Sequence, residues 1–173
     1  MKHAVYGIVS TPEQASLIAG RLRESGFTGN DISVLFPDKQ GTRDFAHEKN
    51  TKAPEGAATG GVAGMGVGAV LGWLAGIGSL AIPGVGPFIA AGPIMGALSG
   101  AAVGGATGGL VGALVGLGIP EYEAKLYDGK VRGGNALVLV HTEGGDEQKR
   151  AKEILEKAGA ADISSSSESS VNK

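Results

Sequence analysis

Residues 56–120 contain no Asp, Glu, Lys, Arg or His, and this uncharged run constrains the fold more than any other feature of the chain. The run is 65 residues long and holds 21 of the 32 glycines. Many of these glycines recur at every fourth residue, in one ladder from Gly56 to Gly76 and a second from Gly96 to Gly116. Charged side chains normally cover soluble surfaces, so we expect the run to be buried in protein or in lipid.

The four-residue spacing predicts helices that pack closely. Four residues turn a helix through about 400°, so the glycines form a stripe along one face. The nine glycines of residues 56–80 oppose helix formation by roughly 9 kcal/mol relative to alanine, and tight GxxxG-type packing can offset that cost. The predicted helix-packing residues are Gly60, Gly64, Gly68, Gly72, Gly76, Gly96, Gly100, Gly104, Gly108, Gly112 and Gly116.

The prolines of AIPGVGPFIAAGP, residues 81–93, predict a turn between the two ladders. Each predicted helix then has about 25 residues, or roughly 37 Å, which is enough to cross a hydrocarbon core of about 30 Å. Two other interpretations remain open. The run could be a low-complexity linker, although linkers keep no four-residue register, or a hairpin buried inside a soluble protein.

The sequences on either side of the run predict two similar α/β halves. In the first, a strand over HAVYGIV precedes a helix that begins at Thr11 and Pro12, with Gln14 completing a capping box, and a strand over DISVLF follows. In the second, NALVLVHT, DEQKRAKEILEKAG and ADISSS repeat this order. Two βαβ halves in series predict an α+β fold, a split ferredoxin-like domain interrupted by a glycine-zipper helical hairpin.

The predicted organisation therefore has six parts. They are a first βαβ half at 1–37, a polar connector at 38–55, the glycine-zipper hairpin at 56–119, an amphipathic connector at 120–133, a second βαβ half at 134–166 and a disordered tail at 167–173.

Composition excludes several classes of function. Fifteen basic and seventeen acidic residues leave no strong field to attract nucleic acid, so we expect no nucleic-acid partner. The absence of cysteine removes disulfides, thiolate zinc sites and thiol nucleophiles. The first residues, MKHAVYGIVSTPEQA, lack the apolar core and cleavage site of a secretory signal, so we expect the chain to begin in the cytoplasm.

The sequence offers little for catalysis. GVGPFIAAG and GMGVG are glycine-rich but neither follows a strand and opens a helix, as a dinucleotide-binding loop requires. His3 and His141 could approach each other across neighbouring strands as a two-histidine metal site, but no third ligand is evident. We therefore predict a protein that is not an enzyme, with no catalytic, cofactor-binding or metal-binding residues.

Basic residues near the run favour the cytoplasmic side of a membrane. They are Lys39, Arg43, Lys49 and Lys52 before it, and Lys125, Lys130 and Arg132 after it. An even number of spans would keep both α/β halves on that side. Tyr122 and Tyr127 could anchor at the membrane interface, or could pack against the chain's own domain.

The order of these segments resembles a widespread bacterial family. The resemblance covers about residues 1 to 165. Its most specific parts are the connector DFAHEKNTKAPEGAATGG and the stretch GIPEYEAKLYDGKVRGGNALVLVH. Its members are general-stress or heat-induced-stress-like proteins with a glycine-zipper insertion and no assigned activity. The resemblance implies bacterial origin and membrane or envelope association under stress, and it supplies no catalytic residues.

Together these features predict a membrane-associated stress-type protein in which the hairpin drives helix packing and self-association. Its partners would be other copies of itself and membrane lipid, and it would lie at the inner membrane with the α/β domain facing the cytoplasm. Two alternatives are a cytoplasmic homo-oligomer with protein-buried hairpins, and a regulatory domain that binds a small ligand on an open sheet face.

Overall fold

A computed structural model describes residues 3–37, 78–82, 86–94, 96–98 and 109–167. These residues form a mixed α/β structure around a six-stranded sheet with the order β3-β4-β2-β5-β1-β6, in which all neighbouring strands are antiparallel. The strands are β1 (His3–Val9), β2 (Ile32–Pro37), β3 (Gly78–Ile82), β4 (Gly86–Ala91), β5 (Ala136–Thr142) and β6 (Ala161–Ser167). The structure confirms that the chain combines helices with an antiparallel sheet, as predicted.

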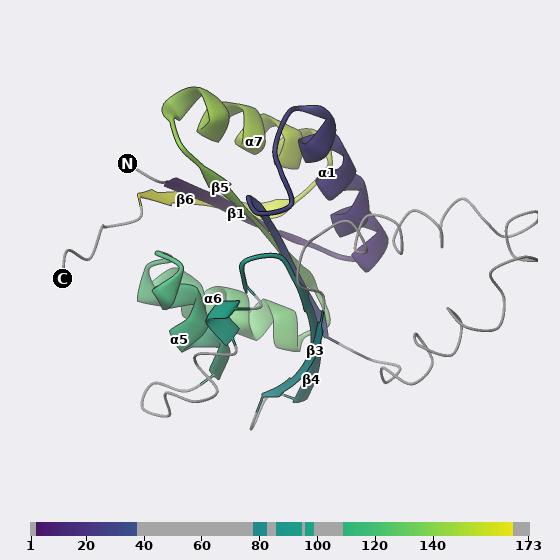
Figure 1. Ribbon diagram of the computed structural model, residues 1–173. Helices are drawn as coiled ribbons and strands as arrows, with labels where there is room; N and C mark the ends of the chain where they lie inside the picture. The colour runs from purple at the N-terminus through teal and green to yellow at the C-terminus, as the bar shows by residue number, and fades with distance from the viewer. Residues whose placement is uncertain (1–2, 38–77, 83–85, 95, 99–108, 168–173) are drawn as a thin grey trace, which may run out of the picture.

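Helices cover both faces of the sheet (Figure 1). Helices α1 (Pro12–Glu24) and α7 (Gly145–Lys157) lie on one face, and α5 (Gly109–Gly116) and α6 (Glu121–Arg132) lie on the other. The central strands bury side chains toward both layers. Val138 joins the core beneath α1 and α7, while Leu139 joins the core beneath α5 and α6. Because both faces of the sheet are covered, β1, β2 and β5 consist mainly of apolar residues.

The predicted start of α1 is confirmed. Thr11 is the N-cap and its Oγ1 accepts a hydrogen bond from the backbone N–H of Gln14 at 3.2 Å, with proline at the first helical position. The Gln14 side chain accepts from the N–H of Ser10 and donates to the carbonyl of Ala158 at 2.7 Å. The cap therefore also ties the start of α1 to the end of α7.

Residues 81–93 differ from the prediction. Instead of a turn between two helices, residues 78–82 and 86–91 form the antiparallel strand pair β3–β4, which we call the β3–β4 hairpin, and β4 pairs with β2 from Val34 opposite Ala91 to Pro37 opposite Phe88. The prolines do prevent a helix here. However, Phe88 and Ile89 are buried against the sheet, and this burial favours a strand over an exposed turn.

These strands correct the predicted position of the turn. Strand β2 ends at Pro37 and β3 begins at Gly78, and both belong to one sheet. The predicted turn at 81–93 is wrong where the structure describes it, because residues 81–82 and 86–91 are strand residues of that sheet.

Several other predictions fall outside the described residues. They include the connector at 38–55, the first ladder from Gly56 to Gly76, and the predicted tail at 167–173 except for Ser167, which is instead the last residue of β6 (Ala161–Ser167). The second ladder is described only at 96–98 and in α5. Among the described helices, none has the length and apolar character needed to cross a membrane.

Candidate functional site

Three of the predicted helix-packing glycines lie in the described part of the chain. Gly96 follows β4, and Gly112 and Gly116 lie on α5. A Cβ atom added at Gly96 or Gly116 would meet nothing within 4 Å. Instead, α5 packs inward through Leu110, Ala113 and Leu114. The other predicted glycines lie outside the described residues, namely Gly60, Gly64, Gly68, Gly72, Gly76, Gly100, Gly104 and Gly108.

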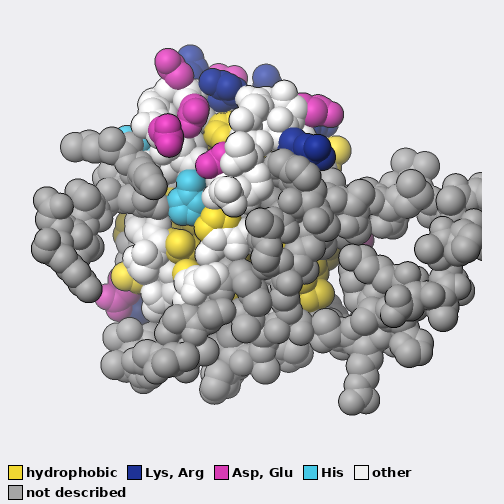
Figure 2. All heavy atoms as spheres, viewed as in Figure 1, with side chains coloured by type: hydrophobic (Ala, Val, Ile, Leu, Met, Phe, Trp, Pro, Cys, Tyr) yellow, Lys and Arg dark blue, Asp and Glu magenta, His cyan; other side chains and the backbone are white. Residues whose placement is uncertain are grey.

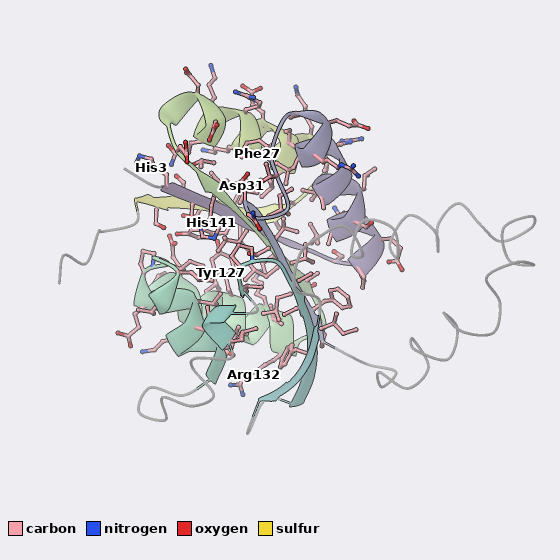
Figure 3. All side chains as sticks on the ribbon, viewed as in Figure 1. His3, Phe27, Asp31, Tyr127, Arg132 and His141 are labelled. Carbon is pink, nitrogen blue, oxygen red and sulfur yellow. The ribbon has the colours of Figure 1, made fainter. Side chains whose placement is uncertain are left out.

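The two-histidine metal site is wrong. In the β1–β5 pair, His3 lies opposite Thr142 and His141 lies opposite Ala4. Directly opposed residues share a face and successive residues alternate, so His3 and His141 lie on opposite faces of the sheet (Figure 3). In the described ranges, no three His, Asp or Glu side chains come together as metal ligands would.

The most connected polar group of the described structure lies between α6 and the β1–β6 edge of the sheet. We call Tyr6, Glu123, Tyr127 and Ser164 the tyrosine–glutamate cluster. The Tyr6 hydroxyl donates to Glu123 Oε2, and Ser164 Oγ donates to Glu123 Oε1 at 2.9 Å. The Tyr127 hydroxyl donates to the backbone carbonyl of Asp162. The two tyrosine rings meet edge to face, with their centroids 5.3 Å apart.

Burial sets the ionisation of the cluster. Removal from water, followed by the hydrogen bond to Glu123, raises the pKa of Tyr6 to about 12. Burial and then the Glu123 carboxylate also raise the pKa of Tyr127 above its ordinary value. Both phenols therefore keep their protons at neutral pH. Each donates a hydrogen bond that joins α6 to β1 or β6, so the cluster positions α6 on the sheet.

Local geometry explains how these side chains meet. Glu123, Tyr127 and Lys130 are spaced i, i+4, i+7 and so share the face of α6 that looks toward the sheet, where Figure 3 shows Tyr127. Lys130 Nζ forms an ion pair with Asp162 Oδ2 at 2.7 Å. Asp162 has a φ of 50°, a left-handed conformation that Asp tolerates better than most residues, and the β1–β6 register shifts beside it.

Sequence reasoning missed this cluster, although it had weighed one member. Tyr127 packs against its own domain and is 1% exposed, so a role as an interfacial anchor is wrong for this residue. Tyr122 is 82% exposed. Two signals could have indicated the cluster: the spacing of Glu123, Tyr127 and Lys130 on one helix face, and a single tyrosine hydroxyl within the apolar run of β1.

The sheet face needed for the ligand-binding alternative is covered in the described structure. Phe88 of β4 and Leu139 of β5 are buried there beneath α5 and α6, where Leu114 of α5 joins the same core. On the opposite side, side chains of both charge signs gather over α1 and α7 (Figure 2). Neither surface exposes an apolar face of the sheet, and neither carries charged side chains of a single sign.

Comparison with known proteins gives no match. No family model matches the chain, and no curated protein or solved structure matches it. The resemblance to the bacterial stress family therefore stays a prediction, and the function must be argued from the chain's own residues.

Proposed function

We propose that this chain is a non-enzymatic, membrane-associated protein that assembles with other copies of itself through its glycine-rich insertion. In this proposal the α/β part is a split ferredoxin-like domain. The order β2-β5-β1-β6, with α1 and α7 on one face, supports it because this is the arrangement of two βαβ halves joined in series. The hairpin β3–β4 would then extend that sheet.

The observation that carries the proposal is the open surface at the described ladder glycines. Within the described part of the chain, a Cβ added at Gly96 or Gly116 would meet nothing within 4 Å beyond its own chain neighbours and helix backbone, while the opposite side of α5 is buried. An exposed glycine on an uncharged helix lets another helix backbone approach closely. A second copy of the chain offers such helices, so the glycines would join copies rather than parts of one domain.

The uncharged run and the topology together support membrane association. Residues 56–77 carry no charge, and they lie between β2 and β3 of one sheet. The insertion would therefore enter and leave the lipid on one side, which the nearby basic residues favour as the cytoplasmic face of the inner membrane. A stress role remains what the family resemblance implies.

A lipid-free homo-oligomer is the second candidate function. The same open glycines support it, because helices from several copies could bury one another in a protein core. The two candidates differ in whether lipid is needed to cover the uncharged run.

Fractionation and sizing separate these possibilities. We expect the expressed chain to sediment with membranes and to be released by mild detergent as a defined oligomer. Gly116→Leu should lower the oligomer mass, because the leucine side chain prevents close helix approach. Gly20→Leu is the control, since Gly20 also faces open space but lies on α1 outside the ladders.

Each outcome decides between the candidates. A defined lipid-free particle in the soluble fraction would support the second candidate and overturn the first. A soluble monomer at all concentrations would overturn both.

A further inference from the structure

Exposed apolar side chains are concentrated on one side of the described structure. Of its four exposed large hydrophobic residues, Val115 lies on α5 and Tyr122 and Leu126 lie on α6. Only Leu17, on α1, lies elsewhere. Apolar groups gathered on neighbouring helices are typical of an interaction surface.

Four exposed residues form a stripe along α6 and its C-cap. Tyr122, Leu126 and Gly129 lie on α6 and Gly133 is its C-cap in helical conformation; they are spaced by four, three and four residues, so they share one helix face. We call them the α6 stripe. Its first half carries two large side chains and its second half carries none. A Cβ atom at Gly129 would meet nothing within 4 Å. The stripe is therefore bulky at one end and recessed at the other.

Charges alternate along one flank of this stripe. Glu121, Lys125, Asp128 and Arg132 follow one another at similar spacing, and Figure 3 shows Arg132 on the outer side of α6. Lys125 pairs with Glu121 at 2.8 Å, and Arg132 pairs with Asp128 at 2.9 Å. The row reads negative, positive, negative, positive. When the row is reversed, every charge faces its opposite.

We propose that α6 is a homodimer interface in which the α6 stripes of two copies pack antiparallel about a twofold axis. Tyr122 and Leu126 of one copy would lie against Gly133 and Gly129 of the other. On the flank, Lys125 would face Asp128 of the second copy, and Glu121 would face its Arg132. A twofold interface must complement itself, and the α6 stripe does so in both shape and charge.

The rest of the structure supports a second copy as the occupant. The tyrosine–glutamate cluster and the Lys130–Asp162 ion pair fix the opposite face of α6 to the sheet, so the stripe is held on an anchored helix. The flanking cations are already paired with carboxylates, which gives an anionic membrane little to attract. None of the ladder glycines takes part, so this interface does not depend on the proposed function.

Sedimentation equilibrium of the full chain in mild detergent tests the proposal. Leu126→Glu should reduce the average mass by about half at concentrations where the wild-type chain is fully associated, because one interface is lost. Leu17→Glu is the matched control and should leave the mass unchanged. Lys125→Glu should weaken association, and Lys125→Glu with Asp128→Lys should restore it, because the altered row again complements its own reverse.

Disulfide trapping gives a second readout that uses the absence of native cysteine. A Leu126→Cys chain mixed with a Gly129→Cys chain should form a covalent dimer under mild oxidation. A Leu17→Cys chain treated alone is the control and should not. Cross-linking no stronger than the control, or an unchanged mass for Leu126→Glu, would overturn the proposal. If Leu126→Glu abolished binding to neutral phosphatidylcholine vesicles without changing the mass, the stripe would belong to a lipid surface instead.

Discussion

Gly92 shows how one residue can be fixed by a distant part of the chain. Its φ is +87°, and an added Cβ atom would lie 2.0 Å from the carbonyl oxygen of Ile32. Just beyond it, the N–H of Ile94 donates to the buried Ser33 Oγ at 3.1 Å. Glycine therefore lets the chain leave β4 while remaining against the start of β2.

We predict that Gly92→Ala destabilises the protein by about 2–5 kcal/mol, because it adds both left-handed strain and a collision with backbone. The urea-unfolding midpoint would measure this. Gly20→Ala is the control, since Gly20 lies in α1 with open space around its Cβ, and it should gain roughly 0.5–1 kcal/mol. Equal midpoints for the two variants would contradict the close packing at Gly92.

Tyr6 gives a prediction about alkaline pH. Its pKa in the folded protein is raised by burial to about 12, from an ordinary value of 10.0. Below pH 10 the Tyr6 hydroxyl is protonated in both the folded and the unfolded protein, so it causes no change in stability with pH there. Between about pH 10 and 12 the unfolded state loses its proton first, and stability falls. The buried Tyr127 contributes a loss of the same sign, because its pKa is also raised. Tyr6→Phe should therefore make the fall of the unfolding midpoint over that window less steep. A fall as steep as in the wild-type chain would show that Tyr6 is not responsible.

Residue roles were predictable from sequence only where they depend on near neighbours. The Thr11 cap follows from residues within one helical turn. Gly92 depends on Ile32, and Asp162 adopts its left-handed conformation beside Tyr127 and Lys130. No local pattern identifies such partners, so these two positions became evident only in the folded structure.

At the scale of elements, α6 is anchored to the sheet by hydrogen bonds around one carboxylate. Glu123 accepts from Tyr6 and from Ser164, and Tyr6 is fully buried. The helix thereby joins the sequence after the insertion to the first and last strands of the sheet. Its attachment determines whether the core beneath α5 and α6 stays covered.

We predict that Glu123→Ala lowers the free energy of unfolding by about 1–3 kcal/mol, because the buried Tyr6 hydroxyl loses its acceptor. Glu123→Gln should cost less, since its amide oxygen can still accept. Glu121→Ala removes only an exposed, solvent-screened ion pair and should leave the free energy of unfolding nearly unchanged. Chemical denaturation with amide exchange of α6 would measure all three. A loss for Glu121→Ala as large as for Glu123→Ala would reject the anchoring role.

Helices and strands with a regular apolar pattern or a helix cap could be predicted from the sequence. Strands that depend on pairing with a distant strand could not. Helices α1 and α7 and strands β1, β2 and β5 follow from capping and apolar patterns. The hairpin β3–β4 does not, because Pro87 and the flanking glycines read as a turn when pairing with β2 is unknown. The tyrosine–glutamate cluster was missed for the same reason, since β1, α6 and β6 meet only in three dimensions.

For the whole molecule, the described residues already provide a sheet with a core on each face. The strands that bound residues 38–77, β2 and β3, belong to that one sheet. We therefore predict that replacing 38–77 with a flexible Gly/Ser linker of equal length keeps the sheet folded but removes the chain from the membrane fraction.

Circular dichroism, amide exchange of β5 and cell fractionation would measure this separation. The same linker placed in the Gly116→Leu background would show whether the second ladder still joins copies. Loss of β5 protection in the linker variant would mean that 38–77 is needed for folding, contrary to the prediction.

The position of β5 has a consequence for the order in which the chain is made. Strands β1 and β2 pair with β5 and not with each other, yet about a hundred residues separate β2 from β5. A ribosome adding 5–20 residues per second needs roughly 5–20 s to cover that distance. Throughout that interval the uncharged run emerges before the sheet can close. Membranes, chaperones and neighbouring nascent chains thus meet the insertion before its own domain exists.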